Sequence, residues 1–335
     1  MRKLRRVLLV GLAILLALPV AGALYQTLSV RSESVRFPAP GSFVNVAGAG
    51  ERAERRLHFV CVGQGEPTVI FEPGGFGGAL SSRMAREEVS AHTRVCSYDR
   101  MGMGWSDPGP SVISVGLLAG DLERLSVQAG LRPPFILVPV SFGGLVAELF
   151  TRRHPEQVAG LVSVDAANSI AVERFAERIT RMHVASVYLA AAAARIGLLR
   201  LLDPFGFRKE PAYAAQNMAF LYRAEPMDTF CGIARGLQAT RGELAAAPPL
   251  AADLPLTVLV HEKPDKLLPP GLADETQTIE REWLGLQKEF AQRSRRGTWR
   301  VVPGSDHLIA SGQPRVVADA VLDMLAEVRR AASPR

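Results

Sequence analysis

A serine between an apolar run and a helix-like segment is the side chain best suited to nucleophilic chemistry in this sequence. Ser141 follows the apolar residues 135–140, and two glycines come shortly after it. A strand, a tight turn and a helix in this order form a nucleophile elbow, which raises a serine hydroxyl above a sheet. Gly143 occupies the small position two residues later, whereas Pro139 stands where the usual G-x-S-x-G pattern has glycine. We predict that Ser141 is a nucleophile; its alternative role is to cap the following helix.

A nucleophilic serine needs a base, and one of the six histidines is well placed for that role. His307 follows a strand-like segment at residues 299–302 and a turn, and it precedes the last helix-like segment. A loop at this point would bring the imidazole beside Ser141, where it can remove the hydroxyl proton and later protonate a leaving group. The other five histidines, including His261, fit strand-edge, loop or helix-surface positions.

The acid that would orient the imidazole has two candidates. Asp165 follows the apolar residues 160–164, and Asp265 follows residues 256–264. Either carboxylate, at the end of a strand, could hold His307 and stabilise its cation. The sequence leaves the choice between them open, with Glu262 as a more remote third candidate.

The negative oxygen that forms after attack needs backbone N–H donors. One donor is expected to be the amide of Phe142, directly after the nucleophile. The second is expected in the glycine-rich segment 71–78, with Gly75 as the first choice and Phe76 as the next. The alternative for this segment is a flexible turn without a catalytic role.

The same motifs give no reason to expect a cofactor or a metal ion. Residues 71–78 do not have the spacing of a dinucleotide fingerprint, and no acidic residue follows a second strand in the required place. The chain has no Walker loop and no Cys/His cluster with metal-ligand spacing.

A regular alternation of strand-like and helix-like segments must position these residues. Eight strands are predicted, at residues 43–46, 57–62, 68–71, 93–98, 135–140, 161–164, 256–260 and 299–302. From the third onward they are nearly continuous in Val, Ile and Leu, as in parallel strands that are covered on both faces. The first two alternate more and suit an antiparallel edge. Helices predicted at residues 79–90, 117–130, 142–154 and 316–329 complete the pattern of a doubly wound α/β sheet.

One long insertion interrupts this alternation. Residues 168–253 contain no good strand and are rich in Ala, Leu and Arg, with Pro and Gly between helix-like stretches. About 85 residues are too many for an ordinary connection between two strands. We predict a helical subdomain at this place.

The composition limits what the chain can be. Its 335 residues are 48% apolar and 21% charged, which excludes a disordered tail, a coiled coil and a collagen-like rod. The net charge of +6 comes from 39 basic and 33 acidic residues, and the first six residues contribute four of the surplus positive charges. No basic stripe remains in the body, so a nucleic-acid partner is not expected.

The N-terminus has the pattern of a targeting segment. Residues 7–24 carry no charge and follow the basic cluster, and they are just long enough for a helix that approaches the thickness of a bilayer. We favour an uncleaved anchor in residues 1–30 over a signal peptide cleaved near residues 21–23, because the apolar run is long for a signal peptide. The positive flank would stay inside, and the rest of the chain would then be extracytoplasmic. A Pro-interrupted linker is expected at residues 31–41.

An oxidising location would make the three cysteines relevant. Cys61 and Cys96 lie in predicted strands, whereas Cys231 lies in a helical region. One disulfide can form if those strands are neighbours with both side chains on one face. Three buried thiols are the alternative.

The sequence resembles the α/β-hydrolase superfamily. Four segments carry the resemblance in the family's order: the glycine-rich loop at 72–78, the stretch 98–107, the elbow at 141–144 and the histidine loop at 304–307. The resemblance covers about residues 36–328, and the Asp-Arg-x-Gly-x-Gly-x-Ser run that begins at Asp99 is its most specific part. The chain looks most like bacterial membrane-anchored or exported serine hydrolases, which share the linker at residues 37–41 and the Leu-His-x-x-Cys strand that ends at Cys61.

The resemblance implies an α/β-hydrolase fold with an eight-stranded, mostly parallel sheet. The core would be residues 31–167 and 254–335, and residues 168–253 would be a helical cap over the pocket. In the family, Asp99 and Arg100 support the floor of the site, and the strands of Cys61 and Cys96 lie side by side, which favours a disulfide. Family members have their acid after either strand, so Asp165 and Asp265 both remain.

The predicted function is that of a serine hydrolase of the esterase type, which acts without a cofactor. Ser141, activated by His307, would attack an ester, thioester or amide of a small to medium, apolar molecule, and water would release the acyl-enzyme. A serine rather than an aspartate at the elbow argues against the haloalkane dehalogenase and epoxide hydrolase chemistry of relatives. The alternatives are an acyltransferase and, because Pro139 and Val140 could misplace the serine, a non-catalytic binding or scaffold protein.

Overall fold

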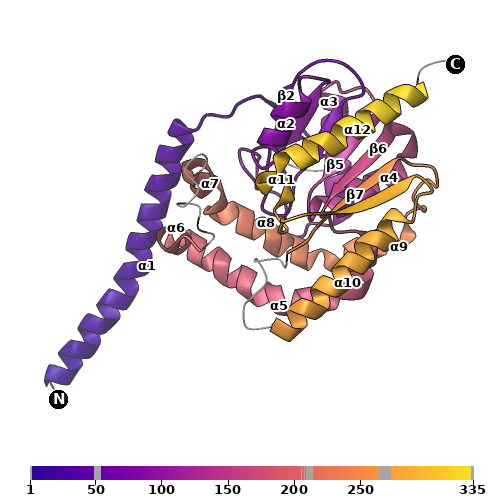
Figure 1. Ribbon diagram of the computed structural model, residues 1–335. Helices are drawn as coiled ribbons and strands as arrows, with labels where there is room; N and C mark the ends of the chain where they lie inside the picture. Colours follow the sequence, from indigo (N-terminus) through magenta and orange to yellow (C-terminus); the bar gives the residue numbers. More distant parts are fainter. Residues whose placement is uncertain are drawn as a thin grey trace.

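The computed structural model describes residues 2–48, 54–204, 206, 208, 214–263 and 273–332, without the side chains of a few residues inside the helices. Eight strands and the helices around them form the body, from which the first helix projects (Figure 1). The strands are β1 (Ser42–Asn45), β2 (Arg56–Val62), β3 (Val69–Glu72), β4 (Val95–Tyr98), β5 (Phe135–Pro139), β6 (Val158–Val164), β7 (Leu256–His261) and β8 (Gly297–Val302).

All eight strands belong to one sheet in the order β1-β2-β4-β3-β5-β6-β7-β8. The pairs β1/β2 and β2/β4 are antiparallel, and every pair from β4 to β8 is parallel. This confirms the predicted α/β-hydrolase fold with its antiparallel edge. The central strands β3, β4 and β5 are buried along their whole length, as in parallel strands that helices cover on both faces.

Helices cover both faces of the sheet. The helices α3 (Val115–Gln128), α4 (Gly143–Arg153) and α10 (Ala273–Ala291) pack on one face around Leu118, Leu149 and Leu286. On the other face, α2 (Arg83–Val89) and α12 (Pro314–Ala332) pack around a second apolar cluster that includes Phe71 and Val321. The short helices η1 (Pro155–Gln157) and α11 (Ile309–Gly312) complete the body. Helix α10 was not predicted from the sequence.

The described residues between β6 and β7 form five helices, within the predicted insertion. They are α5 (Ser169–Arg195), α6 (Leu198–Leu202), α7 (Ala214–Leu221), α8 (Ala224–Arg235) and α9 (Leu237–Ala246). The first begins at Asn168, whose side chain accepts a hydrogen bond from the Ala171 amide at 3.1 Å, as an N-cap residue does. Helices α5 to α8 lie together between α1 and the sheet, to the left of and below the strands in Figure 1.

The first helix, α1, runs from Arg2 to Arg36 and contacts the insertion through its C-terminal half. The Gln26 amide donates to the Tyr222 carbonyl at 2.8 Å, and Arg200 binds both Gln26 and Glu33. These contacts explain why residues 31–36 are helical, where a linker was predicted. The linker prediction is therefore wrong for these six residues, and the chain leaves the helix only at the prolines that follow.

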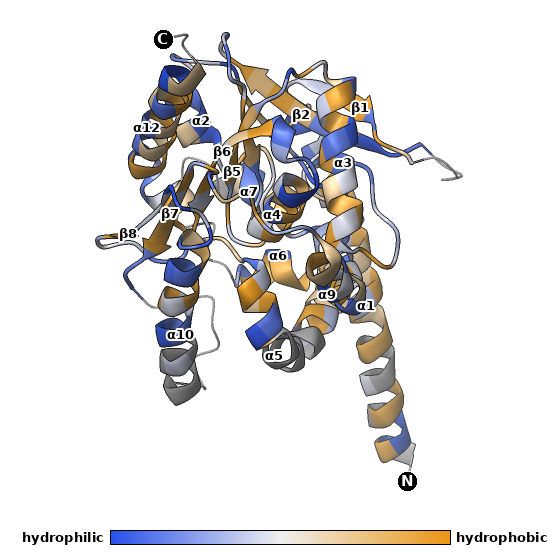
Figure 2. Ribbon diagram, turned by 90° about the vertical axis from the view of Figure 1, so that its right-hand side faces the viewer, coloured by the Kyte–Doolittle hydropathy of each residue, from blue (hydrophilic) through white to orange (hydrophobic). Residues whose placement is uncertain are grey.

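Large apolar side chains are exposed along the projecting part of α1, among them Leu8, Leu9, Leu15, Leu16 and Leu18. In Figure 2 this helix extends away from the body toward the N-terminus. A search of the helices, limited to the described residues, finds none that is long and apolar enough to cross a membrane.

The disulfide considered from the sequence is present. Cys61 on β2 lies opposite Cys96 on β4 in the antiparallel register, with the two Cα atoms 4.1 Å apart, and the sulfur atoms are bonded. Cys231 is a buried free thiol on α8.

Candidate functional site

Ser141 follows the end of β5 in the strained turn that an elbow requires. Its φ is +50°, in the left-handed region that a non-glycine residue enters at a cost of about 1–3 kcal/mol and that is concentrated at functional sites. The Ser141 amide donates to the Val164 carbonyl at 3.2 Å, and the Ser141 carbonyl accepts from the Ala167 amide at 2.8 Å. These bonds tie the turn to the end of the neighbouring strand β6.

Two glycines allow the helix after Ser141 to start so close to its neighbours. A Cβ atom on Gly143 would lie 2.6 Å from the Pro73 carbonyl oxygen, and one on Gly144 would lie 2.1 Å from the Ala167 carbonyl oxygen. Pro139 ends β5 without an N–H, and the next residue, Val140, donates instead to the Glu72 carbonyl at 3.0 Å. The proline therefore leaves the strand paired up to the serine.

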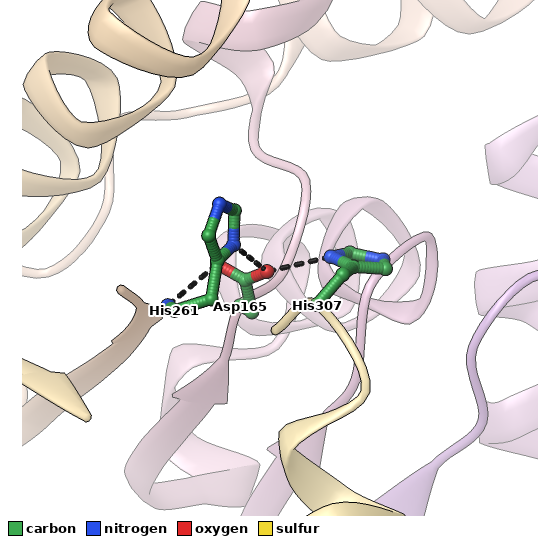
Figure 3. Close-up of side chains that lie close together, drawn as sticks. All are labelled: Asp165, His261 and His307. Atoms are coloured by element: carbon green, nitrogen blue, oxygen red, sulfur yellow. Dashed lines mark hydrogen bonds and ion pairs between the residues drawn. The ribbon is translucent and has the colours of Figure 1, made fainter. Parts of the chain in front are cut away.

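Three side chains form a hydrogen-bonded chain at this edge of the sheet. Ser141 Oγ lies 2.8 Å from His307 Nε2, and His307 Nδ1 lies 2.5 Å from Asp165 Oδ2. Figure 3 shows the Asp165 carboxylate pointing at the His307 ring. The three residues belong to the turns after β5, β6 and β8. They lie close together because the carboxyl ends of parallel strands meet at one edge of the sheet.

Asp165 is completely buried and well provided with donors. Its own turn is strained, with φ +44°, and its amide donates to the Leu259 carbonyl at 2.7 Å. Besides His307, Oδ2 faces His261 Nδ1 at 2.5 Å, and Oδ1 accepts from Trp283 Nε1 at 2.9 Å. Burial disfavours the charged carboxyl, but the hydrogen bonds from His261 and His307 and their charges outweigh it and lower the pKa of Asp165 to about 2.

Of the other two acids predicted from the sequence, one lies outside the described residues and the other has a different partner. Asp265 belongs to residues 264–272, which lie outside the described residues. Glu262 accepts a hydrogen bond from the Gly304 amide at 2.8 Å, so its carboxylate supports the turn before His307.

The glycine-rich loop after β3 lies against the serine. A Cβ atom on Gly74 would be 3.5 Å from the Ser141 Cβ, which is ordinary contact distance. Gly75 faces the ring of Phe230 on α8, and Phe76 stacks on the same ring with centroids 3.9 Å apart. Among the described residues, the amides of Phe142 and Gly75 have no hydrogen-bond acceptor. Two backbone donors are thus available close to the serine.

A buried ion pair supports this loop from below. Arg100 Nη2 binds Glu72 Oε1 at 2.8 Å, and Nη1 donates to the Gly74 carbonyl at 3.1 Å. Asp99 accepts from the Ala79 amide and from His58, both at 2.7 Å. Arg100 therefore binds a carbonyl of the loop, and Asp99 binds an amide just after it, so the two neighbouring residues hold the loop in place.

The sequence matches a family of known proteins. Residues 69–320 match the profile of a family described as the alpha/beta hydrolase family, which is about three quarters of the chain. The chain belongs to the alpha/beta hydrolase family.

Curated relatives of this α/β hydrolase occur in bacteria and in fungi. An uncharacterized protein of Schizosaccharomyces pombe is 42% identical over 80 residues, which are 24% of this chain and 15% of that protein. The uncharacterized protein YqjL of Bacillus subtilis is 21% identical over 267 residues, 80% of this chain and 87% of that protein. A 2-hydroxy-6-oxononadienedioate/2-hydroxy-6-oxononatrienedioate hydrolase of Escherichia coli is 36% identical over 132 residues, 37% of this chain and 44% of that protein. The chain spans less than a fifth of the first of these relatives.

Solved structures show the same fold. A thermophilic esterase from Thermogutta terrifontis superposes with a TM-score of 0.61 at 23% identity, over 86% of this chain and 99% of that one. A laboratory-evolved variant of a potato epoxide hydrolase superposes with a TM-score of 0.64 at 18% identity, over 86% and 99% of the two chains.

Three residues of the site were not found from the sequence of this α/β hydrolase. His261 was grouped with the histidines expected at strand edges, in loops or on helix surfaces. It is in fact buried at the end of β7, and its Nε2 lies 2.6 Å from Glu280 Oε2 on α10. Trp283, one turn further along α10, binds Asp165. The signal for His261 was its place at the carboxyl end of a predicted strand that neighbours the strand of Asp165. Glu280 and Trp283 had no such signal, because α10 was not predicted.

The cluster of Asp165, His261 and His307 also brings three potential metal-ligand atoms within 4.8 Å of one another, in the part of the chain that is described. The same Asp165 oxygen, however, is hydrogen bonded to both rings. The hydrogen bonds alone account for the arrangement, and we interpret it as an acid–base network.

Proposed function

We propose that this α/β hydrolase is a serine hydrolase that cleaves ester-type bonds through Ser141, His307 and Asp165. The observation that carries the proposal is the unbroken chain of contacts from Ser141 Oγ to His307 Nε2 at 2.8 Å and from His307 Nδ1 to Asp165 at 2.5 Å. A carboxylate only accepts hydrogen bonds, so the neutral ring keeps its proton on Nδ1. Nε2 then has a free lone pair for the serine proton.

In the first step Ser141 Oγ attacks the carbonyl carbon of the substrate while its proton passes to His307 Nε2. Asp165 stabilises the imidazolium that results. The tetrahedral intermediate collapses when the bond to the leaving group breaks, and the leaving alcohol, thiol or amine takes the proton from Nε2. The product of this step is an acyl group on Ser141 Oγ.

In the second step a water molecule replaces the leaving group. His307 Nε2 takes a proton from the water as its oxygen attacks the acyl carbon, and it returns that proton to Ser141 Oγ when the acid product departs. In both steps the amides of Phe142 and Gly75 are the proposed donors to the negative oxygen, with Phe76 as the alternative second donor. The contact of Gly74 with Ser141 supports this assignment.

The groups above the serine support an apolar acyl or leaving group. Phe142, directly after Ser141, and Phe76 are both half-buried, and Phe76 stacks on Phe230 of α8, which also contacts Gly75. We propose that residues 168–253 act as a cap and that the stacked phenylalanines line the way to the serine. A serine at the elbow favours acyl transfer over epoxide opening, although epoxide hydrolases share the fold.

The contacts at the elbow weigh against the non-catalytic alternative. That alternative rested on displacement of the serine by Pro139, yet the Val140 amide keeps the strand paired and Ser141 reaches His307. An acyltransferase would use the same residues, with an alcohol or amine in place of water in the second step.

A fluorophosphonate probe tests the proposal directly. We expect covalent labelling of the full chain at Ser141, identified by peptide mapping, and no labelling of Ser141→Ala. Ser111→Ala, at an exposed serine, is the matched control and should label like the natural protein. Absence of labelling in a protein that is folded by circular dichroism would overturn the proposal. Product analysis with an ester then separates hydrolysis from transfer, because only transfer forms a new ester or amide.

We also propose that residues 1–30 attach the protein to a membrane, with the catalytic domain on the extracytoplasmic side. The eighteen uncharged residues 7–24 after a basic cluster support this location, and so does the Cys61–Cys96 disulfide, because disulfides persist in oxidising compartments. Fractionation of cells that express the full chain, with N-terminal sequencing, tests it. Retention in the membrane with an intact N-terminus is expected for the anchor, and release of a shortened soluble protein would indicate a cleaved signal.

A further inference from the structure

A second histidine shares the acid of the proposed triad. The rings of His261 and His307 stand on either side of the Asp165 carboxylate, and both Nδ1 atoms lie 2.5 Å from the same oxygen (Figure 3). The His261 backbone amide also donates to Asp165 Oδ1, at 3.4 Å, next to the Trp283 indole. Neither carboxylate oxygen can turn without losing a donor. The direction of the bond to His307 is therefore set from both sides.

His261 itself lies between two carboxylates. Its Nδ1 faces Asp165 and its Nε2 lies 2.6 Å from Glu280, and the side chain is 3% exposed. An ionised carboxylate accepts but cannot donate, so both ring nitrogens satisfy their partners only when both carry protons. Burial alone would favour the neutral ring, but the hydrogen bonds to Asp165 and Glu280 and their charges dominate and raise the pKa of His261 to about 10.

We infer that His261 is a positioning residue which, held as an imidazolium between Glu280 and Asp165, aims the Asp165 carboxylate at His307 and keeps His307 uncharged in the resting site. The inference rests on the proposed function. The centroids of the two rings are 6.2 Å apart, so a fixed positive charge on His261 opposes a second proton on His307. His307 can then accept the serine proton at a lower pH than it could beside Asp165 alone.

Among the described residues, the titratable groups that face His261 come from three elements. Asp165 follows β6, Glu280 belongs to α10, and His307 follows β8. Glu262, the next residue in the chain, is directed to the Gly304 amide. Removal of the His261 charge therefore leaves only the negative charges of two carboxylates near His307, which favours a proton on His307. Removal of the Glu280 charge takes away a negative charge and leaves the positive charge of His261, which disfavours that proton. The two changes must act on His307 in opposite directions.

The test is the pH dependence of the rate at which a fluorophosphonate labels Ser141. In His261→Asn the shorter amide can still donate to Asp165 but carries no charge. We therefore expect the acid limb of the pH profile to move to higher pH by about 0.5 to 2 pH units. This range is the effect of a unit charge about 6 Å away, at a high and at an intermediate effective dielectric constant. In Glu280→Gln, whose amide oxygen can still accept from Nε2, the limb should stay in place or move down. A merely structural role would lower the rate in both variants without these opposite shifts.

Two results would overturn the inference. One is an acid limb in His261→Asn that stays within about 0.3 pH units of the natural position. The other is an upward shift of similar size in both variants. If His261→Asn does not fold, nitrogen-15 NMR of the natural protein decides, because both ring nitrogens of His261 must carry protons at pH 8, and a single protonated nitrogen would refute the argument.

Failure of the proposed function would look different. It would show as absence of labelling at Ser141 in the natural protein. NMR titration of the His307 ring in Ser141→Ala, with and without His261→Asn, needs no activity and still measures the effect of the His261 charge.

Discussion

Replacement of Asp165 by asparagine separates the two carboxylates that the sequence offers as the acid. Asp165 is completely buried, and its carboxylate accepts N–H groups from His307, His261 and Trp283. Asparagine has nearly the same shape but only one acceptor oxygen, and its NH₂ group would face an imidazole. The His307 ring would then place its own proton on Nε2, where it cannot accept the proton of Ser141.

The expected loss follows from this change of tautomer. In triads of this kind, asparagine in place of the aspartate lowers the rate by about 10⁴-fold with little change in geometry, which corresponds to about 5 kcal/mol of transition-state stabilisation. Because Asp165 also holds His261, we expect a loss of at least about 10³-fold even where the network relaxes in part.

The assay is the second-order rate of fluorophosphonate labelling at pH 7.5 (about one pH unit above the pKa of an unperturbed histidine), followed by hydrolysis of any ester found by screening. Asp265→Asn is the matched variant, because Asp265 is the other aspartate that ends a suitable segment. It should keep the natural rate within a few-fold. Thermal unfolding of both variants checks that each is folded.

One outcome would refute the reasoning. If Asp165→Asn labelled within about tenfold of the natural rate while Asp265→Asn lost orders of magnitude, Asp265 would be the acid. The contact between Asp165 and His307 would then have only a structural role.

Three further predictions rest on other parts of the structure. Gly75→Ala would place a Cβ atom 2.6 Å from the Phe230 ring, so it should lower kcat by about tenfold or more. Phe230→Leu should restore part of that loss. An unchanged kcat in Gly75→Ala would mean that the loop does not touch the reacting oxygen. Loss of the disulfide in Cys61→Ser, which opens a loop with a sequence separation of 35 residues, should lower the free energy of unfolding by about 3–4 kcal/mol in denaturant titrations, and an equal stability would contradict the pairing. The raised pKa of His261, about 10, predicts a contribution to stability that is complete below about pH 6.5 and is lost as pH rises through 10. Over this range Tm should therefore fall more in the natural protein than in His261→Asn. Parallel curves of Tm against pH would contradict this prediction.

Local patterns in the sequence determine much of this fold. Strands β3, β5 and β7 are rich in Val, Ile and Leu, and short segments of this composition suit parallel strands that are buried on both faces. The turn after such a strand is also encoded locally, because Gly143 and Gly144 can pack where a Cβ would collide. For these reasons Ser141 and its elbow can be recognised from about ten consecutive residues.

Contacts between distant segments depend on the tertiary structure. Asp165 and His307 are 142 residues apart, and their meeting depends on the register of the parallel strands between them. The same register brings His261 to the acid, although its own neighbours in the chain suggest only a strand edge. Cys61 and Cys96 likewise pair because antiparallel strands set them opposite each other.

Helix α10 illustrates the physical reason. Its sequence is polar enough to read as surface, so nothing local marks Glu280 and Trp283 as partners of buried groups. Only when α10 packs beside β7 do these side chains meet His261 and Asp165. Short-range periodicity identifies a helix or strand because backbone geometry repeats along the chain. The partner of a charged side chain depends instead on how distant segments pack against the sheet, and no single segment carries that information.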